Sequence, residues 1–145
     1  MRTQLIALTV LWLMVSACGS TASPAAPAAP GVPVQVAGGT YTNLTPVELA
    51  EMLKHKDFNF VNTHIPYEGE LEQTDAFIPF EETGPQRVGD YPADKNARVV
   101  LYCRSGRMSA MVAEELVQAG YTQVWNLDGG FIEWEKAGYT VIHKK

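Results

Sequence analysis

Residues 99–109 read VVLYCRSGRMS, in which an apolar run leads into a cysteine and then into a loop with one glycine and two arginines. The run over 99–102 is rich in β-branched and aromatic residues and predicts a buried strand. Helical spacing of apolar residues follows from Met108 to Ala119, and Gly120 is placed to end that helix. Cys103 is therefore predicted to lie at a strand-to-helix turn, where backbone N–H groups and the positive end of a helix dipole favour an anion.

The loop that follows Cys103 favours a thiolate, the form in which cysteine acts as a nucleophile. Arg104 and Arg107 add positive charge and are expected to attract an anionic substrate. Gly106 allows a close backbone approach or a positive φ angle. The usual alternative for a free cysteine is a buried structural residue, and the composition of the loop favours the nucleophile over it.

Strand and helix signals alternate along residues 40–145. Thr45, Pro46 and Glu48 form a capping-box pattern that begins a helix reaching about Lys54. Residues 64–97 are rich in glycine and proline and predict mostly loop. The remaining predicted elements are strands at 41–44, 57–63, 121–125 and 139–142 and a short helix at 131–135. This alternation predicts an α/β fold, a single domain with a parallel sheet and helices on both faces, in which ligands bind at the carboxyl ends of the strands.

Two polar residues, Asp128 and Ser109, are expected to support the Cys103 loop without contacting the substrate. Asp128 precedes Gly129-Gly130 and is predicted to cap the short helix. Ser109 is the sixth residue after Cys103, the position at which a Cys-loop phosphatase or arsenate reductase needs an arginine to bind its oxyanion. Ser109 therefore disfavours those two enzyme classes.

The amino-terminal residues predict export. A basic start and an apolar stretch from Leu5 to Val15, eleven residues and too short to cross a bilayer as a helix, predict a signal peptide over 1–17. Residues 15–18 resemble the bacterial lipobox, which implies a lipoprotein with an acyl chain on Cys18; an ordinary signal peptide with a chance cysteine is the alternative. The lipidated cysteine and an Ala/Pro-rich linker then occupy 18–39, and the domain occupies 40–145. The expected location is the cell envelope, anchored to a membrane on its periplasmic or other extracytoplasmic face.

Charge and cysteine content limit the partners. The chain has 145 residues with 11 Lys and Arg against 16 Asp and Glu, a balance that disfavours nucleic-acid binding. With Cys18 lipidated, Cys103 has no cysteine with which to form an internal disulfide. No spacing typical of a zinc, haem or nucleotide site is present, and no cofactor is expected. Residues 68–82 hold six carboxylates and no Lys or Arg, which leaves open a solvated acidic loop, a docking surface for a basic protein or a weak cation site.

Residues 99–109 together with 127–139, which read LDGGFIEWEKAGY, resemble the rhodanese family of sulfurtransferases. The resemblance extends over about residues 40–143 and implies the rhodanese-like fold with a persulfide on Cys103. It also implies that the transferred sulfur is cradled by the backbone of Arg104, Ser105, Gly106, Arg107 and Met108.

The amino-terminal half departs from the family pattern. Rhodaneses usually carry Asp-x-Arg after the second strand and then Gly-His-Ile-x-Gly-Ala, whereas this chain has Asn62-Thr63-His64 and the acidic stretch described above. That region commonly borders the mouth of the site, so the departure bears on substrate selection. His64 is either a base near the site or a loop histidine.

The resemblance to rhodaneses, together with the amino-terminal signals, implies an exported, membrane-anchored sulfurtransferase. Cys103 takes sulfane sulfur from thiosulfate or a polysulfide, and a thiophilic acceptor, a thiol or cyanide, removes it in a second step. The alternative is a non-enzymatic persulfide carrier or envelope interaction domain, for which the acidic stretch would supply the contact surface.

Overall fold

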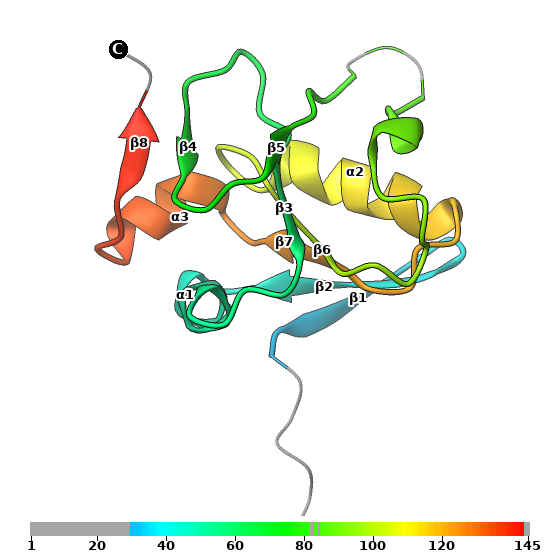
Figure 1. Ribbon diagram of the computed structural model, residues 1–145, viewed down its shortest axis with the longest axis horizontal. Coiled ribbons are helices and arrows are strands. Elements are labelled where there is room, and N and C mark those ends of the chain that lie inside the picture. Colours follow the sequence, from blue (N-terminus) through cyan, green and yellow to red (C-terminus); the bar gives the residue numbers. More distant parts are fainter. Residues whose placement is uncertain (1–29, 82, 84, 144–145) are drawn as a thin grey trace, which may run out of the picture.

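The computed structural model describes residues 30–81, 83 and 85–143, and a six-stranded sheet forms its centre (Figure 1). The strands follow the order β1-β2-β7-β6-β3-β5 across the sheet. Their bounds are β1 Val32–Val36, β2 Gly39–Leu44, β3 Asn59–Asn62, β5 Ala76–Phe77, β6 Val99–Tyr102 and β7 Val124–Leu127. Every neighbouring pair is parallel except β1 with β2. The predicted α/β fold with a mostly parallel sheet is confirmed.

Helices cover both faces of the sheet because the side chains of its central strand alternate between two apolar clusters. Val99 and Leu101 of β6 pack with α2 (Arg107–Gln118) on one face. Val100 and Tyr102 pack with α1 (Pro46–Leu53) and α3 (Gly130–Lys136) on the other. All four β6 residues are buried, as the apolar run predicts. No helix in the described part of the chain has the length and hydrophobicity needed to cross a membrane.

The start of α1 follows the predicted capping box. The Thr45 hydroxyl accepts a hydrogen bond from the Glu48 amide at 3.3 Å, and the Glu48 carboxylate accepts one from the Thr45 amide at 2.8 Å. The hydrogen bond from the Thr45 backbone is the main reason that the pKa of Glu48 lies below its usual value. Glu48 also accepts from the Gly31 amide at 2.9 Å, which ties the beginning of the described chain to α1.

The end of the predicted linker differs from expectation. Residues 32–36, placed within the linker 18–39, form β1, which pairs antiparallel with β2. Val34 and Val36 pack against the core, so alternating valines supply a strand pattern that the surrounding Ala/Pro-rich composition hides. The signal peptide 1–17, Cys18 and the linker up to residue 29 lie outside the described residues.

The segment predicted as mostly loop carries three short elements. They are β4 (Gly69–Leu71), β5 and a 3-10 turn, η1 (Val88–Asp90). β8 (Val141–His143) does not close the main sheet; it pairs antiparallel with β4 in a separate two-stranded sheet (Figure 1). These pairings join residues far apart in sequence, which local patterns do not reveal.

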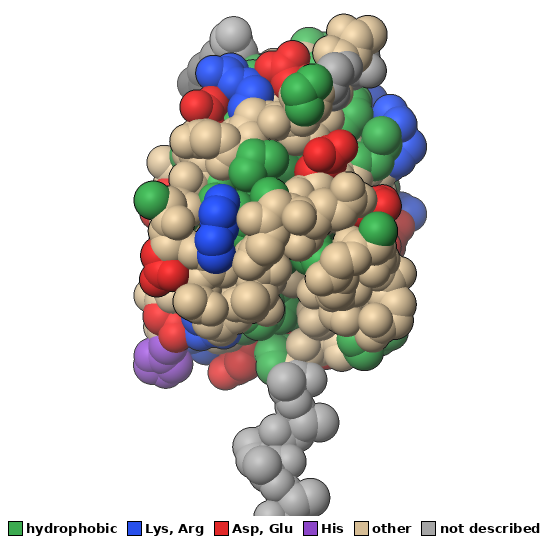
Figure 2. All heavy atoms as spheres, turned by 90° about the vertical axis from the view of Figure 1, so that its right-hand side faces the viewer, with side chains coloured by type: hydrophobic (Ala, Val, Ile, Leu, Met, Phe, Trp, Pro, Cys, Tyr) green, Lys and Arg blue, Asp and Glu red, His purple; other side chains and the backbone are tan. Residues whose placement is uncertain are grey.

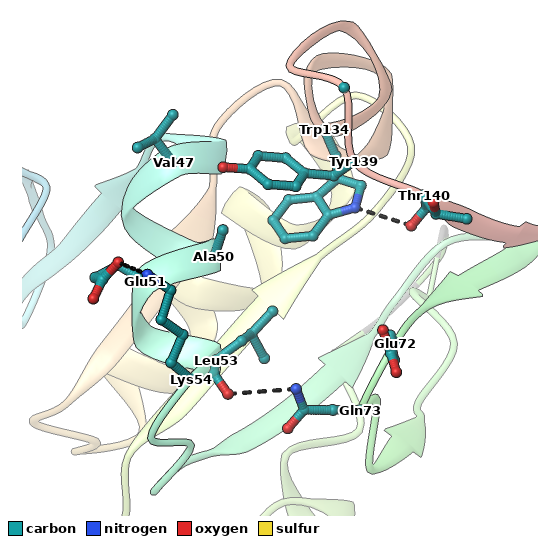
Figure 3. Close-up of a pocket in the computed structure, with 11 residues that line it drawn as sticks. Val47, Ala50, Glu51, Leu53, Lys54, Glu72, Gln73, Trp134, Tyr139 and Thr140 are labelled. Atoms are coloured by element: carbon teal, nitrogen blue, oxygen red, sulfur yellow. Dashed lines mark hydrogen bonds and ion pairs between the residues drawn. The ribbon is translucent and has the colours of Figure 1, made fainter.

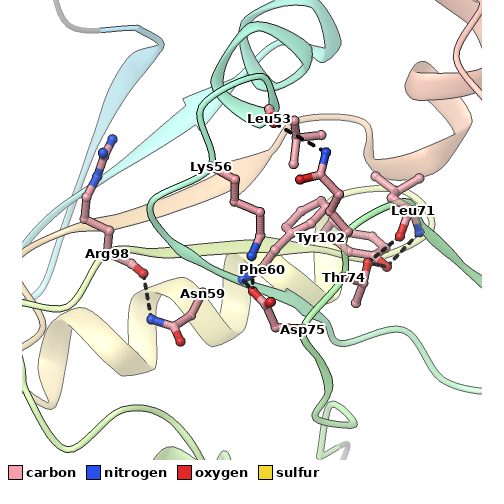
Figure 4. Close-up of polar contacts among 10 residues, drawn as sticks. Leu53, Lys56, Asn59, Phe60, Leu71, Thr74, Asp75, Arg98 and Tyr102 are labelled. Carbon is pink, nitrogen blue, oxygen red and sulfur yellow. Dashed lines mark hydrogen bonds and ion pairs between the residues drawn. The ribbon is translucent and has the colours of Figure 1, made fainter.

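A buried tyrosine ties this segment to the main sheet (Figure 4). The Tyr102 hydroxyl accepts a hydrogen bond from the Leu71 amide at 3.0 Å and lies 2.7 Å from the Thr74 hydroxyl. Nearby, the Asp75 carboxylate accepts from the Phe60 amide at 2.7 Å and from Lys56 at 2.6 Å. Tyr102 is the last residue of β6, so these bonds fix the end of the strand from which the Cys103 loop departs.

Candidate active site

Cys103 directly follows β6 at the carboxyl end of the sheet and is almost fully buried, with 1% of its surface exposed. The chain then turns into α2, whose N-cap is Gly106 with φ of 82°. A Cβ at Gly106 would lie 2.8 Å from the Gly129 nitrogen, so both the backbone angle and the close approach require glycine. The predicted strand-to-helix placement of Cys103 is confirmed.

The Ser109 hydroxyl touches the cysteine sulfur. Its oxygen lies 3.4 Å from Cys103 Sγ and 3.2 Å from the Gly106 carbonyl oxygen, and its single proton can be donated to either. Ser109 is fully buried in the first turn of α2, where the backbone N–H groups have no partner within the helix. Ser109, expected only to support the loop, therefore contacts the Cys103 sulfur directly.

The start of α3 holds the Cys103 loop in place. The Phe131 amide donates to the Cys103 carbonyl at 3.0 Å, and the Ile132 amide donates to the Arg104 carbonyl at 3.1 Å. This approach requires Gly130, which has φ of 58° and at which a Cβ would lie 2.2 Å from the Cys103 carbonyl oxygen. The motif at residues 127–139 thus acts by anchoring the backbone of the motif at residues 99–109.

The predicted helix cap by Asp128 is wrong. The N-cap of α3 is Gly129, and no side chain caps the helix. Asp128 has an exposed side chain, and its amide donates to the Leu44 carbonyl at 2.9 Å, joining the ends of β7 and β2. A side-chain cap is unnecessary because the first amides of α3 donate to the carbonyls of the Cys103 loop. The double glycine was the sequence signal for this arrangement.

The side chains of the expected cradle lie at the surface of the loop. Arg104, Ser105 and Arg107 are exposed, whereas Met108 is half-buried and packs against the core. Arg107 reaches along α2 to Met111 Sδ at 3.7 Å and makes no ion pair with any described residue. Arg104 Nε lies 3.7 Å from the Glu68 carboxylate. Both arginines thus lie on the loop surface, but among the described residues only Arg104 has an acidic partner, and Arg107 extends along α2.

The triplet Asn62-Thr63-His64, which departs from the family pattern, is buried next to the Cys103 loop. Asn62 is buried, donates to the Gly69 carbonyl at 2.8 Å and accepts from the His64 amide at 2.9 Å. His64 is also buried, and its ring lies edge-on to Phe131 with 5.5 Å between centroids. Its Nε2 is 3.6 Å from the Glu68 carboxylate, and neither ring nitrogen has a hydrogen-bond partner among the described residues. His64 is thus a buried neighbour of the loop anchor, and Glu68 contacts the Cys103 loop through Arg104, which no local sequence pattern predicts.

The described residues of the acidic stretch 68–82 do not form a uniformly solvated loop. Asp75 pairs with Lys56, Glu70 accepts from the Tyr67 hydroxyl at 3.2 Å, and Glu81 lies 4.0 Å from Arg87. Within the described ranges, no three His, Cys, Asp or Glu side chains come together so that they could hold a metal ion. On the face of the molecule in Figure 2, acidic and basic side chains are interspersed.

A groove of about 640 Å³ lies between α1 and the corner that joins α3 to β8 (Figure 3). Trp134 and Tyr139 stack along one side with 4.4 Å between ring centroids, and the Trp134 indole N–H donates to the Thr140 carbonyl at 3.0 Å. Across the groove, the Gln73 amide reaches the Leu53 carbonyl at 3.4 Å. No residue of the Cys103 loop lines this groove, so it is separate from the candidate active site.

Comparison with known proteins gives matches in sequence and in fold. The sequence model of the rhodanese-like domain family matches residues 45–137 of this chain. A protein named sulfurtransferase from Allochromatium vinosum is 41% identical over 58 residues, which cover 40% of this chain and 52% of that relative. The match therefore spans about half the length of that protein.

Two solved structures have a similar fold. A rhodanese-related protein from Thermoplasma volcanium has a TM-score of 0.56 at 24% identity, covering 69% of this chain and 96% of that one. The polysulfide-sulfur transferase homodimer from Wolinella succinogenes has a TM-score of 0.52 at 17% identity, covering 69% of this chain and 77% of that one. At these identities the likeness concerns the fold alone.

Proposed function

Because this chain belongs to the rhodanese-like domain family, we propose that it moves sulfane sulfur from thiosulfate or a polysulfide, through a persulfide on Cys103, to a thiol or cyanide. The observation that carries the proposal is the position of Cys103 Sγ, 3.4 Å from the Ser109 hydroxyl in the first turn of α2. Helix N–H groups and a hydroxyl there stabilise negative charge on sulfur. Arg104 and Arg107 on the loop surface attract the anionic donor.

In the first step, the Cys103 thiolate attacks the outer sulfur of thiosulfate. A bond forms between Cys103 Sγ and the outer sulfur, and the bond from the outer sulfur to the sulfonate sulfur breaks. Its electron pair leaves with sulfite, so the total charge is conserved and Cys103 becomes a persulfide anion. The Ser109 hydroxyl lies beside Cys103 Sγ, the attacking atom, where it can stabilise negative charge.

In the second step, the acceptor attacks the outer sulfur of the persulfide. With cyanide, a carbon–sulfur bond forms, the sulfur–sulfur bond breaks, and its electron pair returns to Cys103 as the thiolate while thiocyanate leaves. With a thiol, the product is a new persulfide that carries the thiol's proton. The two products leave in separate steps, so ping-pong kinetics are expected.

Sulfur transfer is favoured over phosphate chemistry by the residue six positions after the cysteine. A Cys-loop phosphatase or arsenate reductase needs a guanidinium there, and this chain places the buried hydroxyl of Ser109 against the sulfur instead. The proposal includes export and membrane anchoring through Cys18, for which the basic and apolar amino terminus and its lipobox-like end are the support.

Intact-protein mass spectrometry tests the proposed function. After treatment of the full chain with thiosulfate or polysulfide, one sulfur, about 32 Da, is expected on the protein, and cyanide is expected to remove it. Cys18→Ala, the matched control, keeps this modification, whereas Cys103→Ser loses it. Sulfur uptake by Cys103→Ser, or turnover of phosphate esters by an unmodified wild type, contradicts the proposal. A persulfide that forms but does not turn over with thiosulfate and cyanide supports the carrier alternative.

A further inference from the structure

One carboxylate oxygen at the candidate active site has two nitrogen neighbours. Glu68 Oε2 lies 3.7 Å from Arg104 Nε and 3.6 Å from His64 Nε2. The Arg104 side chain is 56% exposed and that of Glu68 39% exposed, whereas the His64 side chain is 8% exposed. The carboxylate therefore stands where a buried imidazole meets the solvent-accessible arginine of the Cys103 loop.

The two side chains beside this carboxylate are both tied to the Cys103 loop. Arg104 directly follows Cys103, and its carbonyl is held by the Ile132 amide at 3.1 Å. His64 packs edge-on to Phe131, whose amide holds the Cys103 carbonyl. Both neighbours of Glu68 thus belong to the assembly that anchors the loop. A sulfur compound attracted to Arg104 therefore also meets the negative charge of Glu68 beside it.

We propose that Glu68 sets the charge preference of the Cys103 site, so that it offsets Arg104 and favours acceptor thiols that carry a neighbouring positive charge over thiols that carry a negative one. This inference rests on the proposed sulfur transfer and concerns its second half-reaction. With Arg104 offset, Arg107 is the remaining cation of the loop, and it lies along α2 toward Met111. The effect is that of a partly exposed charge, so it is moderate and weakens with salt.

The test uses three small thiols of similar size and different charge. Cysteamine is cationic, 2-mercaptoethanol is neutral and 3-mercaptopropionate is anionic. The full chain is first loaded with sulfur on Cys103, and the rate of sulfur loss to each thiol is then followed by mass spectrometry at low salt. The ratio of the cysteamine rate to the mercaptopropionate rate is compared between variants, so that the intrinsic reactivity of each thiol cancels.

Glu68→Gln is expected to lower this ratio roughly threefold or more, the effect of removing one partly exposed charge. Arg104→Gln is expected to raise it, because Glu68 is then left without its guanidinium partner. Glu72→Gln is the matched control, since Glu72 is exposed, belongs to the same acidic stretch and lines the separate groove of Figure 3. This control leaves the ratio unchanged.

Opposite shifts in Glu68→Gln and Arg104→Gln support the inference. A ratio that is the same in wild type, Glu68→Gln and Arg104→Gln overturns it while leaving sulfur transfer intact. If Glu68→Gln does not fold, the direction of the Arg104→Gln shift decides: an unchanged or lower ratio overturns the inference. Failure of the wild type to take up sulfur from any donor contradicts the proposed function instead.

Discussion

The Ser109 hydroxyl oxygen lies 3.4 Å from Cys103 Sγ, although the two residues are six positions apart, Cys103 just after β6 and Ser109 within α2. The sharp turn at Gly106 folds the first turn of α2 back over the end of β6 and makes this contact possible. The first turn of α2 therefore presents a hydroxyl to the sulfur atom. The contact gives a direct way to measure how strongly the site stabilises a thiolate.

Ser109→Ala removes this hydroxyl, and we expect the thiolate of Cys103 to be less stabilised. Alkylation of Cys103 by iodoacetamide at neutral pH is expected to slow roughly fivefold, which corresponds to the loss of one hydrogen bond of about 1 kcal/mol. Ser105→Ala, an exposed position on the same loop, serves as the control and is expected to keep the wild-type rate. Equal alkylation rates in wild type and Ser109→Ala contradict the prediction.

Gly130→Ala should destabilise the protein and displace the Cys103 loop. The new Cβ would lie 2.2 Å from the Cys103 carbonyl oxygen and 2.6 Å from the Arg104 carbonyl, both of them backbone atoms. Gly138→Ala is the matched control, because its φ of 91° is also positive but nothing lies within 4 Å of the added Cβ. Urea unfolding is expected to show a loss of about 1 kcal/mol for Gly138→Ala and several times more for Gly130→Ala. Similar losses in the two variants mean that the close approach does not matter.

Two buried tyrosines predict a loss of stability at alkaline pH. Burial raises the pKa of Tyr102 to about 12 and also raises that of Tyr91, against about 10 in an unfolded chain. Because the folded state binds these protons more tightly, their contribution is fully present below pH 10. For Tyr102 it is lost as the pH rises from about 10 to 12, on the order of 3 kcal/mol, and Tyr91 adds a loss in the same direction. The free energy of unfolding, measured by urea at a series of pH values, is expected to fall over this range.

Tyr91→Phe isolates one of these two groups. The Tyr91 hydroxyl is buried and has no hydrogen-bond partner among the described residues, so replacing it with hydrogen leaves nothing unpaired. The variant is therefore expected to be as stable as wild type at pH 7, or more stable, and to lose less stability between pH 10 and 12. A marked loss at pH 7 contradicts this account of Tyr91.

The role of β1 predicts where the chain can be shortened. A chain that begins at Gly39 lacks β1, and with it the packing of Val34 and Val36 against the core and the bond from Gly31 to Glu48. It is expected to be less stable than a chain that begins at Pro30, by on the order of 2 kcal/mol for the lost apolar burial. Thermal unfolding of the two chains measures the difference. Equal midpoints mean that β1 adds nothing to stability.

The sequence predicts best where the pattern is local. The apolar run of β6, the cysteine after it and the helical spacing of α2 lie within 20 residues, so the strand, the turn and the helix are all readable. The capping box of α1 is equally local. The strand at 121–125 is displaced in the structure to Val124–Leu127, because the buried residues that pair with β6 decide its bounds.

The rest depends on contacts between distant segments. The pairing of β4 with β8 joins residues about 70 positions apart, and no local sequence pattern predicts this pairing. The prediction that Asp128 caps α3 is wrong because a capping pattern reflects only neighbouring residues. In the structure the first amides of α3 donate instead to carbonyls of the distant Cys103 loop. The meeting of His64, Glu68 and Arg104 likewise depends on where β3 and β6 end side by side in the sheet.

The two edge strands of the main sheet are poor sites for pairing with a strand of another chain. β1 contains Pro33, which has no N–H to donate, and β5 is only two residues long. A sheet edge with such strands is a poor template for adding a further strand, whether from another copy or from an unfolded chain. The described domain is therefore expected to resist edge-to-edge aggregation, even where many copies are crowded together.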